Sequence, residues 1–363
     1  MDKELKLPFY AKATIFLIGG FALLTMLYIA QHIIVPIIFA IIIAIALHPL
    51  VCFLVRLRIN RVIAIIITLL LSFIVIAAFG TLLFSQAIRF GESWPILVDK
   101  FTAMLNRTIT DASGYFDIDP QKIHDWIAKT KDELISKSSA LIGHTLISIG
   151  GRIAVMLLIP VYIFMLLFYQ PLLLEFIRRL FGTNHSLKVN EVITQTKKLI
   201  QRYIIGLLVE AFIVAFLYSA GLLILGLDYA ILLGFIAALL NIIPYIGGMI
   251  AVSLIVIIAL ATKDSISTPL LIIVLSIFIH LIDNSFIIPK IVASKVKINA
   301  LISITAIIAA SALLGVPGMI ICIPVIGIIK LIFGHIEPLK PWGFLLGDTM
   351  PPLLKFKPIF KKK

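Results

Sequence analysis

The segment Ile282–Lys290 reads IDNSFIIPK and places an acid and an amide near the end of a long apolar run. A carboxylate in hydrocarbon is costly, so an acid within an apolar span normally faces protein or water and marks an ion or substrate path. Asp283 is therefore the first candidate for such a path. The segment ends on Pro289 and Lys290, which open a basic motif that we expect on the cytoplasmic side of a membrane.

An apolar run lies on each side of this segment, at 229–262 and 300–333, and each is broken near its middle by proline and glycine. A continuous helix over either run would be about 50 Å long, whereas the hydrocarbon core of a bilayer is about 30 Å thick. Because proline removes a backbone donor and glycine permits a tight reversal, two half-helices meeting inside the membrane fit each run better. The residues expected at the breaks are Asn241, Pro244, Tyr245, Gly247 and Gly248 in the first run and Gly315, Pro317 and Gly318 in the second.

Composition sets the class of protein. Of the 363 residues, 61% are hydrophobic and 13% are charged, which leaves too little polar surface for a soluble globule, so the chain is an integral membrane protein with several spans. The net charge of +13 comes from basic residues beside apolar spans, which favours anionic lipid head groups as partners over nucleic acid. Cys52 and Cys322 are interpreted as packing residues, and neither a metal site nor a cofactor site is recognisable.

Charge and hydropathy divide the chain into five parts. These are three transmembrane helices in residues 1–88, an extracytoplasmic helical insertion at 89–146, a fourth helix with a basic cytoplasmic amphipathic segment at 147–202, a transport core at 203–334, and a basic cytoplasmic tail at 335–363. The third helix is expected to end near Ile88, and new helices are expected to open at Trp94-Pro95 and Asp119-Pro120. In the amphipathic segment we expect two short helices broken at residues 182–184, followed by a fifth transmembrane helix from Tyr203.

The position of the basic residues tests the two hairpins. Eight simple spans would place Lys290, Lys295 and Lys297 outside with no acid between them, against the positive-inside rule. If residues 229–262 dip into the membrane and return, the helix at 268–288 runs inward, and those lysines become cytoplasmic together with both termini. The expected fold is all-α and polytopic, with about six full transmembrane helices, two re-entrant helical hairpins and an inverted repeat in the C-terminal half. Eight continuous spans are the alternative.

Four further polar residues accompany Asp283. His280 lies three residues before Asp283 and four before Asn284, so on a regular helix all three share a face, and a His-Asp pair can relay a proton. Glu210 lies within the fifth helix and Asn241 at the first break. Each also has a structural interpretation: Asp283 as a helix cap or hydrogen-bonding residue, His280 as a packing residue, and Glu210 as a partner of Arg202.

The C-terminal half resembles the autoinducer-2 exporter family, which includes the PerM-type permeases. The resemblance rests on Pro-Tyr-Ile-Gly-Gly at 244–248, Asp-Asn at 283–284 before Pro-Lys-Ile at 289–291, and Gly-Val-Pro-Gly at 315–318 before Pro324. It implies a multi-pass carrier of the bacterial inner membrane, with export of autoinducer-2 attributed to some members and cation/proton antiport to others. The chain departs from the family pattern at Asn299-Ala300, where His-Pro is frequent, and at Ala310-Ser311, where paired glycines are frequent.

Three classes of function follow from these features. The first is a secondary transporter of a small polar molecule or an ion, coupled to a gradient such as that of protons, because no Walker-type loop for ATP is present. Cation/proton antiport is its variant. The second is a non-transporting membrane scaffold with the insertion at 89–146 as its partner surface. An intramembrane enzyme ranks last, because the Ser, His and Asp residues form no recognisable nucleophile arrangement. A re-entrant core needs a fixed frame, so we expect a homo-oligomer.

Overall fold

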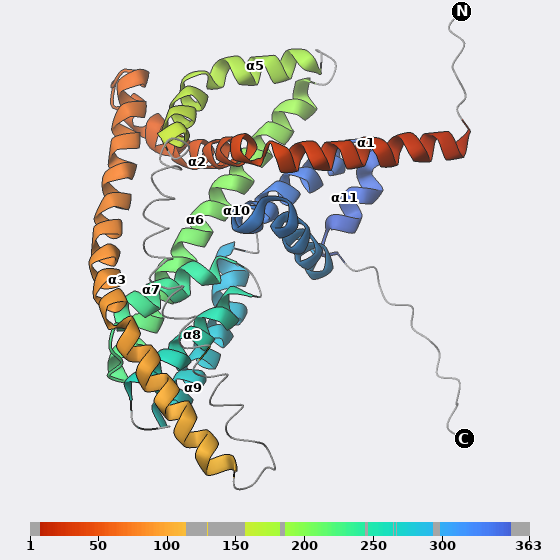
Figure 1. Cartoon of the computed structure of the whole chain (residues 1–363). Helices are drawn as coiled ribbons and strands as arrows, with labels where there is room; N and C mark the ends of the chain where they lie inside the picture. The colour runs from red at the N-terminus through yellow and green to blue at the C-terminus, as the bar shows by residue number, and fades with distance from the viewer. Residues whose placement is uncertain are drawn as a thin grey trace, which may run out of the picture. The chain divides into compact units, whose positions relative to one another are not determined.

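A computed structural model describes residues 8–113, 129, 157–181, 186–243, 246–263, 265, 267–292 and 298–349. These residues are almost all helical, and the only β-bridge among them is an isolated one between Ile298 and Gly347. The labelled helices in Figure 1 are α1 (Phe9–Ile29), α2 (Gln31–Arg56), α3 (Arg61–Ser113), α5 (Gln170–Leu180), α6 (Ser186–Ile224), α7 (Ala230–Asn241), α8 (Gly247–Thr262), α9 (Ser267–Ile282), α10 (Ala300–His335) and α11 (Lys340–Leu346). A π-helix (Asp283–Val292), a 3-10 helix (Glu337–Leu339) and a helix at Leu157–Phe168 complete the described elements. The expected all-α class is confirmed.

Six of the described helices are long and apolar enough to cross a membrane. They are Phe9–Ile29, Gln31–Arg56, Arg61–Met104, Leu187–Ile224, Ser267–Ile288 and Ala300–His335, and the count rises to seven if the bent pair Leu157–Phe168 and Gln170–Leu180 is one span. Helices α7 and α8 have 12 and 16 residues, whereas a transmembrane helix needs about 20. The interruption expected in residues 229–262 is therefore present as two short helices. Of the fourth expected helix, the structure describes only the part from Leu157 onward.

The described chain folds into two compact units that are each discontinuous in sequence. One contains Met1–Ile29, Leu174–Ile200 and Lys295–Lys363, and the other contains Ala30–Leu173 and Gln201–Ser294. The core expected at 203–334 is thus shared between them, with both halves of the first broken run in the second unit and the second broken run in the first unit.

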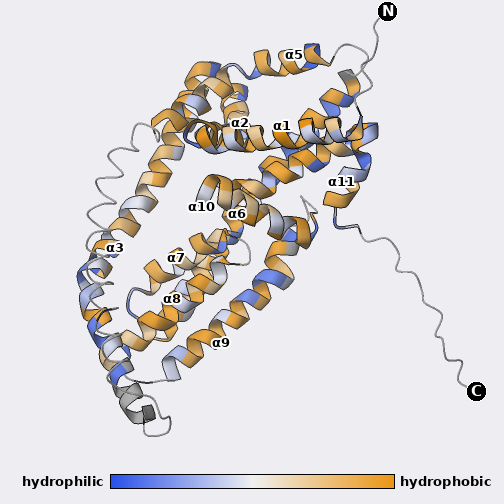
Figure 2. Ribbon diagram, turned by 45° about the vertical axis from the view of Figure 1, so that its right-hand side comes forward, coloured by the Kyte–Doolittle hydropathy of each residue, from blue (hydrophilic) through white to orange (hydrophobic). Residues whose placement is uncertain are grey.

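The second unit has its main hydrophobic core where α6, α7, α8 and α9 meet. Helix α8 packs against α7, α9 and α3, and Figure 1 draws these elements side by side. Residues with at most 2% exposure fill this core, including Tyr218, Leu233, Ile255 and Ile272. Figure 2 colours most of α7 and α8 as hydrophobic, which agrees with their burial within an apolar core. The core therefore gives the broken first run a fixed set of neighbours.

A second core in the same unit joins α2, α3 and the helix Leu157–Phe168. Arg61 donates from Nη2 to the backbone oxygen of Leu167 at 2.7 Å, which satisfies a carbonyl at the end of that helix. Pro49 lies inside α2 and has no backbone N–H, so the carbonyl of Ile45 loses its helical donor. Gln201 of α6 replaces that donor, because its Nε2 lies 2.9 Å from the Ile45 oxygen. A proline break in α2 thus links α2 to α6.

Two predicted helix boundaries were wrong. Helix α3 does not end near Ile88, and no new helix opens at Trp94, because α3 continues through Pro95 to Ser113. Polar residues change the composition there without breaking the helix. Likewise, α6 runs without interruption from Ser186 through Tyr203 to Ile224, so the second amphipathic helix and the fifth transmembrane helix are one element. Both the predicted helix at Asp119-Pro120 and the predicted break at 182–184 lie outside the described residues.

In the first unit, α10 reverses direction at the predicted second break. Gly315 has φ 66° and ψ −154°, a conformation that is essentially restricted to glycine. A Cβ on Gly318 would collide with the backbone oxygen of Ala310, a contact that a straight helix could not make across this separation. The chain therefore folds back between Leu314 and Gly318, at a kink that joins two helices within the 36 residues.

The ends of α10 agree with this reversal. Asn299 caps the start of α10 by accepting a 2.8 Å hydrogen bond from the Ile302 N–H, and its Nδ2 donates to the backbone oxygens of Leu345 and Gly347 at 2.7 and 3.0 Å. A straight α10 would be about 54 Å long, while the largely helical segment from His335 to Leu345 reaches only about 20 Å. Asn299, which stands where the related pattern has His, therefore fastens the start of α10 to the end of α11. Residues 337–346, expected to be part of a tail, are mostly helical.

Candidate functional site

Three helices of the second unit bring Glu210, Asn241 and Asp283 together. Nδ2 of Asn241 donates to Oε1 of Glu210 at 3.2 Å and to Oδ2 of Asp283 at 3.0 Å. Because both acceptor oxygens lie within hydrogen-bonding distance of one nitrogen, they are within about 6 Å of each other. We call these three residues the amide-carboxyl cluster.

Each member of the amide-carboxyl cluster is placed by a local feature of its helix. Asn241 is the last residue of α7, directly before the interruption that separates α7 from α8. Asp283 is the first residue of the π-helix that continues α9, and Glu210 lies within α6. A short π-helix rotates the following side chains relative to an α-helix and is frequent at functional sites. The cluster thus joins the end of α7 and the start of the π-helix to the middle of α6.

Both carboxyl groups of the cluster are buried. Glu210 is 6% exposed and Asp283 is 2% exposed. Oδ1 of Asp283 has no hydrogen-bond partner among the described residues. Two acids that share a single amide donor in apolar surroundings repel each other unless a proton, a cation or a hydrogen-bond donor of a bound molecule offsets their charge. The site is therefore built to accept a positive charge or a polar donor group.

Two hydroxyl groups that the sequence analysis missed lie in the same core. The hydroxyl of Tyr218 lies near the carboxyl group of Asp283 and near the hydroxyl of Ser276. Neither hydroxyl makes a hydrogen bond of good geometry among the described residues, although both are buried. Tyr218 lies eight residues after Glu210 on α6, and Ser276 lies seven before Asp283 on α9. Those spacings place each hydroxyl two helical turns from an acid, a signal that could have identified them.

His280 occupies the side of the site next to α8. Its ring lies so close to Gly248 that a Cβ there would collide with Cε1 and would lie 2.7 Å from Nε2. The same Cβ position is 3.5 Å from Oδ1 of Asn241, so the ring, the glycine and the amide are neighbours. His280 also interacts electrostatically with Asp283. Gly248 is therefore required at this position because it makes room for His280.

The other predicted site residues are placed differently. Asn284 is exposed rather than sharing the buried side of Asp283, because adjacent residues on a helix point in different directions. Glu210 bonds to Asn241 and not to Arg202, which is exposed. Lys290 is exposed, with Nζ 5.3 Å from the ring centre of Phe286. Gly247 is buried at the start of α8, and a Cβ there would collide with the Leu240 oxygen.

Some predicted residues lie outside this cluster or outside the described structure. Gly315, Pro317 and Gly318 belong to the first unit, where they form the reversal of α10. Pro244, Tyr245 and the side chain of Pro289 are not among the described residues. Within the described part of the chain, no group of three or more His, Cys, Asp or Glu side chains is arranged to hold a metal ion.

The first broken run is held at its N-terminal end by α3. Tyr229 precedes α7 with φ 59°, and its hydroxyl lies 2.6 Å from Oγ of Ser93. Its ring packs edge-to-face against Phe90, with ring centres 5.5 Å apart, and Phe90 in turn packs against Trp94. The extension of α3 that the sequence assigned to a separate insertion thus contacts the run that carries Asn241.

Comparison with known proteins identifies relatives along most of the chain. The family model described as "AI-2E family transporter" matches residues 15–337. "Putative transport protein YueF" of Bacillus subtilis (strain 168) is 32% identical over 116 residues, which are 32% of this chain and 31% of that protein. "Putative transport protein YrrI" of the same organism is 28% identical over 134 residues, or 37% of each chain. A "Putative transport protein" of Haemophilus influenzae is 25% identical over 330 residues, which are 88% of this chain and 92% of that protein. The first two matches thus span only about a third of the relative's length.

Proposed function

The chain belongs to the AI-2E transporter family. We propose that it is a secondary transporter of the bacterial inner membrane that moves a small polar molecule by a gradient-driven alternating-access mechanism. The observation that carries the proposal is the buried bridge from Asn241 to Glu210 and Asp283. Intramembrane acids that are not neutralised by a neighbouring cation are characteristic of substrate and ion paths. The arrangement of these acids around a helix break is the feature expected of a transporter binding site.

In the proposed mechanism, the break after Asn241 couples binding to movement. Asn241 ends a helix too short to span a membrane, so its amide moves with α7, whereas Glu210 and Asp283 belong to α6 and to the continuation of α9. A cargo that donates hydrogen bonds can replace the amide at one or both acids. Exchange of these bonds would favour one position of the broken run over another, which is the differential interaction that alternating access requires.

Coupling to a gradient follows from the two acids. The pair is most stable with one positive charge bound, and that charge can be a proton, a small cation or a cationic group of the cargo. The hydroxyls of Tyr218 and Ser276 and the ring of His280 supply further polar groups near Asp283. Cation/proton antiport is the second candidate function, because the groups around Asp283 are mostly oxygen atoms and hard cations prefer oxygen ligands.

The proposed topology has two re-entrant hairpins, cytoplasmic termini and an inverted repeat that relates α6 and the first broken run to α9 and the second. Two short helices at 230–262 and the reversal of α10 at Gly315 support it. With this topology the basic residues on both sides of the core are cytoplasmic.

Transport is tested with purified protein in liposomes that contain a pH-sensitive dye. Autoinducer-2 and a panel of similarly small polar compounds and monovalent cations are added under an imposed pH gradient. A transporter changes the rate of proton movement for a subset of these compounds and not for the rest. If every compound gives the same trace with protein-containing and protein-free liposomes, the scaffold interpretation is favoured instead.

A further inference from the structure

Helix α5 carries an exposed apolar stripe that nothing in the described chain covers. Leu172, Phe176 and Leu180 recur every fourth residue and are 64%, 60% and 64% exposed. Residues at this spacing lie on one face of a helix. The neighbouring side of α5 is formed by Leu174 and Ile177, which are half-buried. The helix is thus seated on the protein by one side and presents a separate apolar side outward.

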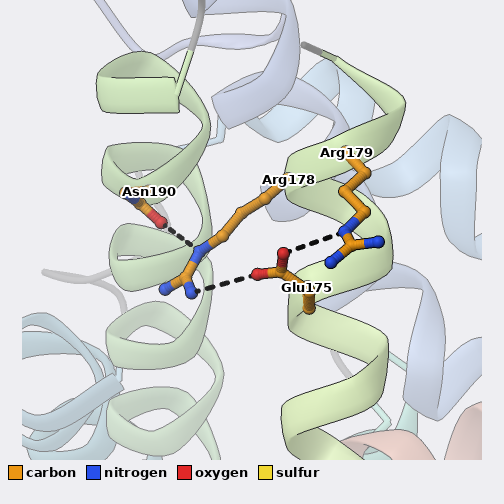
Figure 3. Close-up of polar contacts among 4 residues, drawn as sticks. All are labelled: Glu175, Arg178, Arg179 and Asn190. Atoms are coloured by element: carbon orange, nitrogen blue, oxygen red, sulfur yellow. Dashed lines mark hydrogen bonds and ion pairs between the residues drawn. The ribbon is translucent and has the colours of Figure 1, made fainter. Parts of the chain in front are cut away.

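The flank of α5 next to the stripe is charged. Arg179 Nε lies 3.0 Å from Oε1 of Glu175, and Arg178 Nη1 lies 3.8 Å from its Oε2. Nε of Arg178 donates to Oδ1 of Asn190 on α6 at 2.9 Å. Figure 3 shows the two guanidinium groups on either side of the single carboxylate. Two positive charges and one negative charge leave this flank with one excess positive charge.

We propose that α5 is a membrane-surface helix that binds the phosphate of anionic phospholipids through Arg178 and Arg179. An exposed apolar stripe beside basic residues is the pattern of helices that lie in the plane of the bilayer surface. Only Tyr169 separates α5 from the apolar helix Leu157–Phe168, and the chain bends by 64° between them, so the stripe starts next to a segment apolar enough to enter a membrane. A lipid surface accounts for both features at once, because acyl chains cover the stripe while head groups meet the arginines.

Arg178 and Arg179 are positioned to bind an anion. Arg178 is held between Glu175 and Asn190, so part of its conformational freedom is already lost before a ligand binds. The side chain of Arg179 is 79% exposed, and only its Nε contacts Glu175. Its two Nη groups make no hydrogen bond with the described residues. Guanidinium groups bind phosphate oxygens through paired N–H donors, which a lysine cannot reproduce.

The position of the stripe is tested in the full-length protein in lipid nanodiscs. Cys52 and Cys322 are replaced by alanine, and an environment-sensitive fluorophore is attached at Phe176→Cys or, as a comparison on the seated side, at Leu174→Cys. Brominated acyl chains quench a fluorophore that they contact. We expect strong quenching at 176 and weak quenching at 174. Weak quenching at both positions would show that α5 stands off the bilayer and would overturn the proposal in favour of a protein partner or open solvent.

The lipid preference is tested by comparing quenching by brominated phosphatidylglycerol with quenching by brominated phosphatidylcholine. One excess positive charge predicts about a fivefold preference for the anionic lipid. The Arg178→Gln/Arg179→Gln variant leaves Glu175 as one excess negative charge and should reverse the preference, to about fivefold in favour of phosphatidylcholine. Glu175→Gln should raise the preference for the anionic lipid by about a further fivefold. The Arg89→Gln/Lys100→Gln variant removes the same charge from exposed positions on α3 and should leave the preference unchanged.

The opposite signs of the Glu175 and arginine variants separate charge recognition from damage to the helix, because damage would lower the preference in both. Equal preferences in all four proteins would overturn the assignment of the arginines as lipid ligands. None of these measurements depends on transport, so their outcome is independent of the function proposed for the amide-carboxyl cluster.

Discussion

Nδ2 of Asn241 donates a 3.0 Å hydrogen bond to Oδ2 of Asp283, which joins the last residue of α7 to the first residue of the π-helix after α9. The two residues are far apart in the chain, and each is where its α-helix ends. In an apolar core of low dielectric, such a contact is strong when both partners are present and costly when one is removed. The predictions below follow from this contact and from the elements that hold it.

Replacing Asn241 by alanine should destabilise the protein. The substitution leaves the Glu210 and Asp283 oxygens without their shared donor, and unsatisfied buried acceptors cost about 1–3 kcal/mol. Thermal unfolding of the purified protein measures the loss. Asn284→Ala removes the same group from an exposed position and should change stability by no more than about 0.5 kcal/mol. Equal losses in the two variants would contradict the bridge.

Gly248→Ala should destabilise the protein through His280. The added methyl group overlaps the imidazole ring, and overpacking of this kind costs about 1–3 kcal/mol. In a His280→Ala background the ring is absent, so the same substitution should cost almost nothing. A double-mutant cycle on the free energy of unfolding measures this coupling. Additive effects of the two substitutions would mean that the ring and the glycine are not neighbours.

Gln201→Leu should cost about 1 kcal/mol because it leaves the Ile45 carbonyl of α2 without a donor. Pro49→Ala restores the helical N–H that this carbonyl lacks, so Gln201 should become dispensable in that background. Unfolding free energies of the two single variants and the double variant provide the test. If Gln201→Leu is as costly in the Pro49→Ala background as in the wild-type protein, the side chain does not substitute for the missing backbone donor.

Accessibility of single cysteines separates the two topologies. With a re-entrant first run, Lys263→Cys reacts with an impermeant thiol reagent from outside the cell, and Lys290→Cys reacts only after the cytoplasmic side is opened. Eight continuous spans predict the reverse at both positions. The two residues bracket α9, so each serves as the control for the other. Reaction of Lys290→Cys in intact cells would exclude the two-hairpin arrangement.

The sequence predicted the elements that rest on local chemistry. Gly315 and the break between Asn241 and Gly247 were identified because only glycine tolerates such backbone and because long apolar runs do not fit one span. Glu210 and Asp283 were identified as candidates because buried acids are costly, and Asn241 because it stands at the first break. Their mutual contact could not be predicted, because it depends on how three helices pack and no local pattern links positions so far apart.

The errors have equally specific causes. Polar residues after Ile88 and the Trp94-Pro95 pair resembled the start of a new helix, yet a proline removes only one hydrogen bond and α3 continues through it. Asn284 was assigned to the face of Asp283 from its spacing of four residues to His280, whereas adjacent residues on a helix point in different directions and Asn284 is exposed. Ser276 was missed because serine hydroxyls in apolar helices usually bond to their own backbone, and Tyr218 because its ring was taken as an ordinary core side chain.

The most direct test of the transport proposal compares Asp283→Asn with Asp228→Asn in liposomes, using whichever compound or cation the wild-type protein moves. The two substitutions are chemically identical, but Asp283 is buried beside Asn241 whereas Asp228 is exposed before α7. We expect Asp283→Asn to abolish gradient-driven flux, with at least about a tenfold loss in rate, while the protein stays folded and Asp228→Asn keeps the wild-type rate. Unchanged flux in folded Asp283→Asn would remove the amide-carboxyl cluster from the transport path.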